Sequence, residues 1–332
     1  MENNNSYNQS QNMNGVNMPP KKKRGRKYII ALLILVLGIM LIIAGSIMMS
    51  TSDSTNWKRE DIIKDFSEYN NSVDKIDVDF AFGDVKFQKG ETLKVECSNV
   101  LKDYLDIEYK SDNTLSIDVV SEKFKGQFLI PVAFPPIGFN SSVGEIVITV
   151  PEKTFKSVKI ESVFGTCTVN DIDADDLIVE NVFGETVLLN TNSSQAKLEN
   201  AFGSMSFKNC MLNELKAENS FGEIELDKCE LSGDSKIEVS FGNIVANLYG
   251  NPDDYNYDFD VALGSCSVNG EKPEYYNNRF SKDEISVEVA FGNAEISFDD
   301  SVSFKDISDS VPDSDSNNTE DITDSNGNII VP

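Results

Sequence analysis

The sequence predicts an all-β protein: a parallel β-solenoid, of the single-stranded β-helix kind, with rungs of about 19 residues and one transmembrane helix before it. One observation is a phrase ending in Phe-Gly that recurs with glycines at Gly165, Gly184, Gly203, Gly222 and Gly242. Its step is 19 residues three times and then 20. A fixed step of this size is typical of solenoids, whose units stack to bury a shared core. The other observation is a long uncharged apolar segment that precedes the repeats.

Composition divides the 332 residues into five segments. The apolar run at residues 28–49 has 22 residues without a charge. This is long enough to cross a hydrocarbon core of about 30 Å, so we expect these residues to span the lipid bilayer as a helix. The tails are rich in Asn, Gln, Ser and Asp, and such compositions remain disordered. The predicted order is a basic cytoplasmic tail at 1–27, the transmembrane helix at 28–49, a stalk at 50–72, the extracytoplasmic β-repeat domain at 73–298 and an acidic tail at 299–332.

Charge beside the apolar run predicts its orientation. Six basic residues lie within positions 21–27, and clusters of this kind stay on the cytoplasmic side of a membrane. The sequence therefore predicts a single-pass cell-membrane protein with a cytoplasmic N-terminus and an extracytoplasmic C-terminal domain. The alternative is a cleaved signal peptide, whose apolar core has about 7 to 15 residues and is shorter than this run.

Composition also excludes several functions. The chain has no histidine, which removes the usual general base and the commonest metal ligand. The net charge of −26 argues against nucleic acid as a partner. The five cysteines show no CxxC spacing, so neither a zinc cluster nor a dithiol motif is indicated. We expect no enzyme activity, no catalytic residues and no cofactor, with Ca²⁺ bound by acidic side chains as the alternative.

Alternating apolar and polar residues predict strands at the start of the domain. Residues 75–88 alternate in this way and carry the Phe-Gly pair Phe82 and Gly83. Further strands are predicted at 92–96, 105–109 and 114–120, and we expect this part to be antiparallel. A short helix is expected in the stalk before them.

The segment at 121–143 interrupts the strand pattern with four phenylalanines and three prolines. Long apolar loops without a role are uncommon. We favour a cap over the open end of the solenoid, because arrays need caps for solubility and exposed phenylalanines would form a large apolar patch. The alternative is a binding loop. A strand is expected to follow at 145–150.

The repeated Phe-Gly pair is expected to be structural. Alternation of side chains along a strand places each phenylalanine on the core face, and the glycine permits a turn where a Cβ would clash. A second strand follows each turn, and its first and third residues are expected to point inward. Later units have longer turns, and Leu263-Gly264 replaces one Phe-Gly pair. The predicted repeat residues are Phe82, Gly83, Phe164, Gly165, Phe183, Gly184, Phe202, Gly203, Phe221, Gly222, Phe241, Gly242, Phe291 and Gly292.

Three asparagines share the predicted inward face: Asn181, Asn200 and Asn219. Buried amides must be hydrogen-bonded, and a stack can pair each amide with the next. The sequence therefore predicts an internal asparagine ladder with a structural role. Cys210 and Cys229 occupy one position on adjacent rungs. We favour reduced core thiols over a disulfide there, because the rung spacing of about 4.8 Å exceeds the mean Cβ separation of about 3.8 Å in disulfides.

Acidic residues form a second predicted ladder, on the outward face. We favour a solvated face that is partly neutralised by lysines two positions earlier in the repeats. The alternative is a linear site for divalent cations or a basic ligand. The acidic residues are Glu161, Glu180, Glu199, Glu218, Glu238, Asp260 and Glu288, with Asp79 in the N-terminal copy. The lysines are Lys159, Lys197, Lys216 and Lys236.

Units such as Glu-Asn-Ser-Phe-Gly-Glu-Ile-Glu-Leu at 19-residue steps resemble the putative-adhesin, toast-rack β-strand repeat family of bacterial cell-envelope proteins. The resemblance covers residues 73–298, and the basic tail with one span is similar to that of its membrane-anchored members. It implies a link to envelope-stress signalling. The family is a domain of unknown function, so the resemblance supplies no catalytic residues.

Together these observations favour a non-enzymatic, membrane-anchored adhesion, scaffold or envelope-sensing module. Its expected partners are cell-wall polymers or an envelope membrane protein. One alternative is a sensor or regulator in an envelope-stress signalling system. Another is a calcium-dependent, polysaccharide-acting β-helix enzyme, which the lack of arginine beside the acidic ladder argues against.

Overall fold

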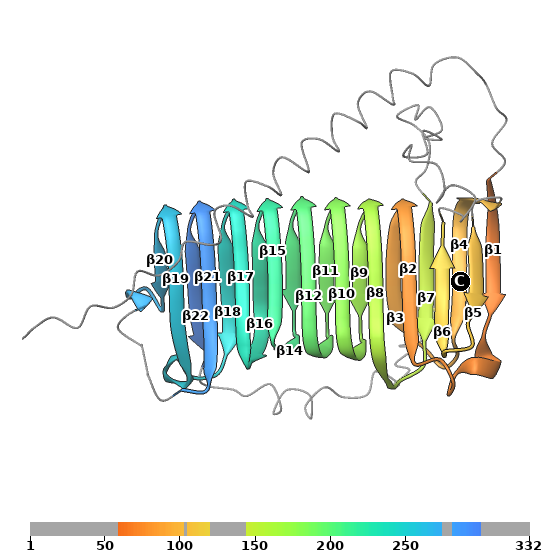
Figure 1. Cartoon of the computed structure of the whole chain (residues 1–332), viewed down its shortest axis with the longest axis horizontal. Coiled ribbons are helices and arrows are strands. Elements are labelled where there is room, and N and C mark those ends of the chain that lie inside the picture. The colour runs from red at the N-terminus through yellow and green to blue at the C-terminus, as the bar shows by residue number, and fades with distance from the viewer. Residues whose placement is uncertain (1–58, 103–104, 120–143, 274–280, 300–332) are drawn as a thin grey trace, which may run out of the picture.

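The computed structural model describes residues 59–102, 105–119, 144–273 and 281–299 (Figure 1). In this part the chain is all β, with the short 3-10 helices η1 (Ser67–Tyr69) and η4 (Pro252–Asp254) and no α-helix. The strands stack side by side into one long array of two sheets, here called sheet A and sheet B. The predicted all-β class and the stacking of the repeats as rungs are confirmed.

Most rungs combine a longer strand in sheet B with a shorter strand in sheet A, and the nine-residue β16 (Ile224–Ser232) continues from sheet A into sheet B. In spatial order, sheet B contains β5 (Asp106–Tyr109), β6 (Thr114–Asp118), β2 (Lys75–Phe82), β8 (Thr154–Phe164), β10 (Asp173–Phe183), β12 (Asn192–Phe202), β15 (Leu215–Phe221), β17 (Asp234–Phe241), β21 (Asp283–Phe291) and β19 (Tyr255–Leu263), with β14 (Met211–Asn213) also beside β12. Sheet A contains β1 (Arg59–Asp65), β4 (Lys94–Leu101), β7 (Glu145–Val150), β3 (Asp84–Lys89), β9 (Cys167–Asn170), β11 (Thr186–Leu189), β13 (Met205–Lys208), β16 (Ile224–Ser232), β18 (Ile244–Tyr249), β22 (Ala294–Asp299) and β20 (Cys266–Val268).

One rung is a strand of sheet B, a tight turn, a strand of sheet A and a corner that returns the chain to sheet B. In the rung formed by β10 and β11, the turn is at Gly184 and the corner is at Asn190, whose φ is 48°. Asparagine tolerates this left-handed conformation better than most residues. Neighbouring rungs pair in parallel with equal residues opposite each other, for example Glu180 with Glu199 and Asn181 with Asn200.

The rungs at both ends are out of chain order. The unit β21–β22 lies between β17–β18 and β19–β20, although it is the last of the three in the sequence. Likewise, β2–β3 lies between the unit β6–β7 and the unit β8–β9. The Leu263-Gly264 unit is therefore the terminal rung, and the units that carry Phe-Gly pairs stack directly on one another.

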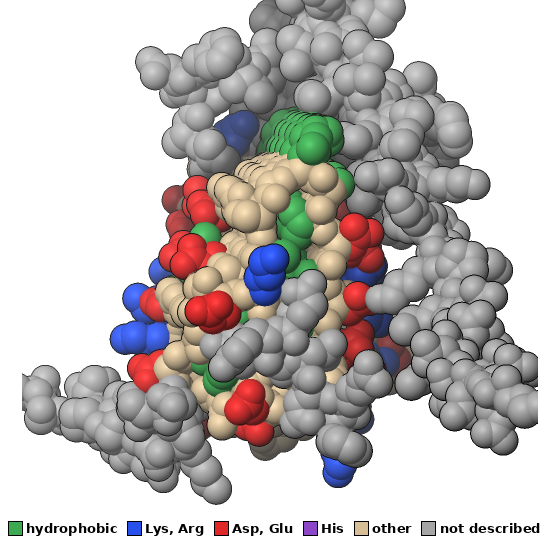
Figure 2. Space-filling view, turned by 90° about the vertical axis from the view of Figure 1, so that its left-hand side faces the viewer, with side chains coloured by type: hydrophobic (Ala, Val, Ile, Leu, Met, Phe, Trp, Pro, Cys, Tyr) green, Lys and Arg blue, Asp and Glu red, His purple; other side chains and the backbone are tan. Residues whose placement is uncertain are grey.

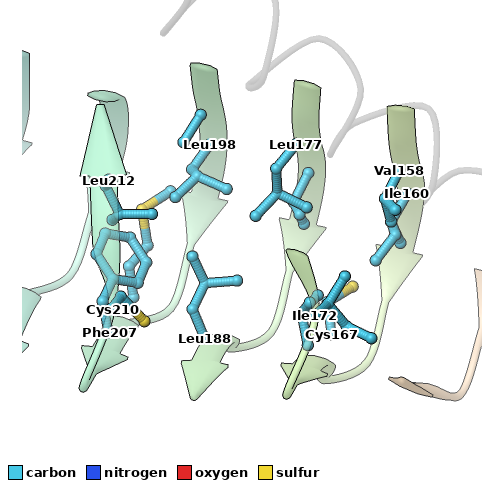
Figure 3. Close-up of a cluster of buried hydrophobic side chains, with 14 of the residues drawn as sticks. Val158, Ile160, Cys167, Ile172, Leu177, Leu188, Leu198, Phe207, Cys210 and Leu212 are labelled. Atoms are coloured by element: carbon cyan, nitrogen blue, oxygen red, sulfur yellow. The ribbon is translucent and has the colours of Figure 1, made fainter. Parts of the chain in front are cut away.

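The interior between the two sheets is filled mainly by apolar side chains that recur at the inward positions of successive rungs (Figure 3). The predicted inward positions of the short strands are confirmed: Cys167 and Val169 are buried, and so are Leu188 and Phe207 in later rungs. Because the same position recurs at each step, the core is a set of parallel side-chain columns. Burying an aliphatic or aromatic side chain of this size contributes about 1.5–3 kcal/mol.

The prediction that the repeated phenylalanines belong to the core is wrong. Asn219 and Ser220 are both buried, so strict alternation stops one residue before Phe221. The register skips this residue in each rung, because Asn200 pairs with Asn219 and the next pair is Phe202 with Phe221. The local irregularity turns the phenylalanine outward, to the edge of the array.

The N-terminal end corrects two further expectations. Strands β2 and β3 belong to the parallel array, while the antiparallel pairs are β1–β4, β4–β7 and β5–β6. The expected stalk helix is wrong for Arg59–Asp65, which forms β1 because its backbone completes the edge of sheet A beside β4. Around these strands, Phe66 is buried and the ring of Tyr69 stacks on that of Tyr109 at 4.2 Å. Described residues therefore cover this end of the core.

Candidate functional site

An acidic column runs along the outward face of sheet B. Its side chains follow one another in backbone register from rung to rung, which places neighbours about 4.8 Å apart, the usual strand spacing. The acidic column consists of Asp118, Asp79, Glu161, Glu180, Glu199, Glu218, Glu238, Glu288 and Asp260 in spatial order. The sequence pattern identified every member except Asp118, which the repeat phrase does not mark.

Lysines two positions before the glutamates neutralise part of the column. Lys197 Nζ lies 2.7 Å from Glu199 and 3.3 Å from Glu180, so it bridges two rungs. Lys236 pairs with Glu238 and also lies 3.2 Å from Glu288. Pairs of this exposure contribute about 0–1 kcal/mol each, so their main effect is to reduce repulsion between stacked carboxylates.

Glu218 is the least compensated glutamate in the middle of the column. Lys216, the lysine two positions before it, forms no ion pair among the described residues. Burial raises the pKa of the Glu218 carboxyl, the neighbouring Glu199 carboxylate raises it further, and Lys236 and Lys197 lower it. The centre of the column therefore holds a carboxyl group that gives up its proton less readily than an ordinary glutamate.

A hollow of about 320 Å³ lies where the column meets the N-terminal hairpin. The hairpin β5–β6 contributes Asp106 and Glu108, which the sequence analysis did not connect with the repeats because their strands are not part of the phrase. No group of three or more acidic or cysteine side chains in the described ranges is arranged to hold a metal ion. The hollow is lined by Asp77, Asp79, Asp106, Glu108, Lys110, Ser116, Ile117, Asp118, Lys159 and Glu161.

The phenylalanines form a second surface column, here called the phenylalanine ladder. Their ring centroids are 4.8 to 5.0 Å apart and the ring planes are within 8° of parallel. Figure 2, a view along the array, shows hydrophobic side chains gathered at one edge. The ladder consists of Phe164, Phe183, Phe202, Phe221, Phe241 and Phe291, and the exposed Leu263 follows at the terminal rung. Phe82 pairs with Phe164 in the backbone register.

A glycine column lies directly beside this ladder and explains the second half of the Phe-Gly pair. Gly184 has φ 145°, and a Cβ on it would lie 1.9 Å from the carbonyl oxygen of Gly165 in the next rung. No side chain fits into that distance, so the glycine is what allows neighbouring rungs to stack this closely. The column also includes Gly144, which the sequence analysis missed. Its carbonyl oxygen would be 2.0 Å from a Cβ on Gly83.

The three asparagines of the internal ladder are buried, with exposed fractions of 3–4%. The expected amide-to-amide pairing is wrong. Asn200 Nδ2 donates to Gly184 O at 3.0 Å and to Ser204 O at 3.4 Å, so each amide ties a glycine turn to the turn of the neighbouring rung. Amides do pair with one another at the exposed corner, where Asn190 Nδ2 donates to Asn170 Oδ1 and Asn209 Nδ2 donates to Asn190 Oδ1.

The cysteines lie among core residues. Cys210 and Cys229 are fully buried on adjacent rungs, where their Sγ atoms contact the carbonyl oxygens of Lys208 and Phe207 respectively. Burial raises the pKa of Cys167 to about 12 and that of Cys97 to about 11. Thiols of this kind are poor nucleophiles because the thiolate is disfavoured.

Several predicted features lie outside the described residues. These are the basic tail at 1–27, the membrane span at 28–49, Trp-containing residues 50–58 of the stalk, the aromatic segment at 121–143 and the acidic tail from 300. Among the described ranges, no helix has the length and apolarity that crossing a membrane requires.

Comparison with known proteins relates the chain to a sequence family. The family described as Toastrack DUF4097 matches residues 73–331. Curated proteins give no match. A solved structure that resembles the chain is described as a putative cell adhesion protein from Clostridium sporogenes ATCC 15579, with 15% sequence identity and a TM-score of 0.36. The likeness covers 73% of this chain and 100% of that one.

Proposed function

Because the chain belongs to the Toastrack DUF4097 family, we propose that it is a non-enzymatic, membrane-anchored module that acts outside the cytoplasm in adhesion or as a scaffold. The anchor is the apolar run at 28–49, and the basic residues before it hold the N-terminus in the cytoplasm. The array then carries its surface columns away from the bilayer.

The acidic column is the observation that supports this proposal best. It presents one carboxylate per rung along nine rungs, which is a periodic line and not a cleft. Solenoids use such long surfaces to bind extended partners. A cell-wall polymer that carries regularly spaced cationic groups fits a line of carboxylates, and many weak contacts then add to one stable attachment.

The chemistry of the described side chains supports a binding role over catalysis. A lyase-type reaction needs a base beside the acidic residues, and two of the lysines there, Lys197 and Lys236, are engaged with carboxylates at Glu180, Glu199 and Glu288. The chain has no histidine to replace them.

Binding of the full-length protein to isolated cell-envelope polymer tests the proposal. The variant Glu180→Gln/Glu199→Gln should lose most of the binding, and added salt should weaken the wild type because the contact is ionic. The matched control is Glu225→Gln, an exposed glutamate on the outward face of sheet A. Equal binding by both variants contradicts the proposal. Copurification with a histidine kinase in place of polymer would favour the sensor alternative.

A further inference from the structure

The phenylalanine ladder is an apolar strip along the turn edge of the array. Phe241 is 37% exposed and Phe291 47% exposed, and Leu263 beyond them is 61% exposed. Apolar side chains that are exposed singly are normal, but a contiguous exposed patch marks a surface that binds a partner. The adhesion proposed above relies on the acidic column and leaves the phenylalanine rings unused.

The stacking of the rings restricts which ligands can bind. Inside the ladder each ring face is covered by the ring of the next rung, at 4.8 to 5.0 Å. A flat sugar or aromatic ligand therefore finds no free ring face to stack on, and only the ring edges are available. From Phe164 to Phe291 the ring centroids make five such steps, or about 24 Å. The strip thus fits a long ligand that carries an apolar line of its own.

The backbone beside the strip favours a helix over an extended peptide. Gly184 N–H donates to Phe202 O at 2.9 Å, and Gly184 O accepts from Asn200 Nδ2 at 3.0 Å. The corresponding glycines of the two neighbouring rungs are engaged in the same way. An extended peptide on this edge would bury N–H and C=O groups that find no partner, which is costly. A helix bonds its own backbone groups, so it can lie against the ring edges without that cost.

Acidic residues border the strip on both sides (Figure 2). On the sheet B side the acidic column lies three residues before each ring, as Glu180 does before Phe183. On the sheet A side the exposed residues Asp84, Glu185 and Glu223 each follow a Phe-Gly pair directly. Among the described residues, none of these three forms an ion pair. No lysine or arginine lies within two positions of any ladder residue, so the borders of the strip favour a cationic partner.

We propose that the phenylalanine ladder docks an amphipathic helix of a partner protein, whose apolar stripe lies on the ring edges and is flanked on both sides by lysine or arginine. About 16 helical residues, at a rise of 1.5 Å each, match the length of the ladder. The cationic flanks then face Glu185 and Glu223 on one side and the acidic column on the other. A second copy of the chain presents the same acidic borders and a net charge of −26, and an anionic membrane is repelled for the same reason.

Binding of a designed peptide to the full-length protein tests the proposal. The probe is a labelled peptide of about 18 leucine and lysine residues, with leucines at i, i+3, i+4 and i+7 and lysines elsewhere. The matched control has the same composition in an order that gives no apolar stripe. The probe should bind at least about tenfold more tightly than the control, and circular dichroism should show that it becomes helical on binding. Equal affinities would mean that charge alone attracts the peptides, and this result overturns the proposal.

Substitutions locate the contact on the array. Phe241→Ala/Phe291→Ala should weaken binding of the probe by at least about tenfold. Met211→Ala is the matched control, because Met211 is 41% exposed and lies outside the ladder, and it should leave the affinity unchanged. Equal affinities of the two variants overturn the proposal. Attachment to cell-envelope polymer should be the same for both variants, so this proposal and the proposed function fail separately.

Photo-crosslinking gives a second measurement that keeps an aromatic ring in the ladder. A photoreactive phenylalanine analogue replaces Phe241 in the full-length protein, and mass spectrometry identifies what it captures in the presence of the probe. The control places the same analogue at Ser206, on the outward face of sheet A. Crosslinks to the probe from position 241 and none from position 206 support the proposal. Crosslinks from position 241 only to lipid, to a second copy or within the chain overturn it.

Discussion

Substituting Gly203 by alanine tests the stacking role of the glycine column. Gly203 has φ 125°, a conformation that residues with a side chain rarely adopt. The added Cβ would lie 1.9 Å from Gly184 O and 2.8 Å from Gly184 C. These atoms belong to the backbone of the next rung, so no side-chain rotation relieves the clash. The two rungs must separate at this edge.

The cost can be estimated from two contributions. Holding alanine at this φ costs about 1–3 kcal/mol. Separating the rungs breaks the hydrogen bond from Gly184 N–H to Phe202 O, which is 2.9 Å long, and an unpaired backbone group costs about 1–3 kcal/mol. The total is about 4 kcal/mol. For a domain of this size, that lowers the melting temperature by about 8–16 °C.

Thermal unfolding of the full-length protein, followed by circular dichroism, measures the effect. Gly270→Ala is the matched control, because Gly270 also has a positive φ, 78°, while a Cβ on it meets nothing within 4 Å. The control therefore reports backbone strain without the clash. If both variants lower the melting temperature equally, close stacking of the glycine column is refuted.

Three further predictions concern the asparagine ladder, the acidic column and metal ions. Asn200→Ala removes the donors to Gly184 O and Ser204 O and should cost about 2 kcal/mol, and an unchanged melting temperature would show that the ladder has no structural role. The pKa of Glu218 is raised in the folded protein, so the folded state holds more protons and the unfolding free energy falls as pH rises through that interval. Glu218→Gln should therefore raise the melting temperature at neutral pH but not at acidic pH, whereas Glu225→Gln should do neither; equal effects at both pH values contradict this assignment. Chelation with EDTA should leave melting and proteolysis unchanged, and a lower melting temperature would point to Ca²⁺ on the array.

The repeat phrase predicted the rungs well because equivalent residues of successive repeats stack on one another. Equal residues at 19-residue steps pair with one another, as Glu180 and Glu199 do, so register along the array could be read from the sequence. The prediction that Phe221 points into the core failed because the strand pairing skips one residue at Ser220. Alternation of apolar and polar residues does not reveal such an irregularity. The acidic column was found by the same phrase, but the hollow beside Asp106 was not.

The spatial order of the rungs was harder to predict than the residue register between neighbouring strands. The sequence analysis followed the chain, and so expected longer turns to absorb the extra residues in the 28-residue step from Gly264 to Gly292. The structure places Phe291 against Phe241, with ring centroids 4.8 Å apart, and leaves Leu263 at the end. Contacts between distant parts of the chain decide this order. Gly144 escaped notice for a related reason, since 24 residues separate it from the rest of its own rung.

At both ends of the array the spatial order of the rungs differs from their order in the chain, and this affects how the array can be shortened. In an ordinary solenoid the last unit of the chain is also the last unit in space, so removing it shortens the rod by one rung. Here the last unit, β21–β22, is held between β17–β18 and β19–β20. A chain that stops before residue 283 lacks an interior layer, and its terminal layer must find a new neighbour. The terminal rung β19–β20 can take its place only after β21–β22 has been synthesised, because β21–β22 is its neighbour in both sheets.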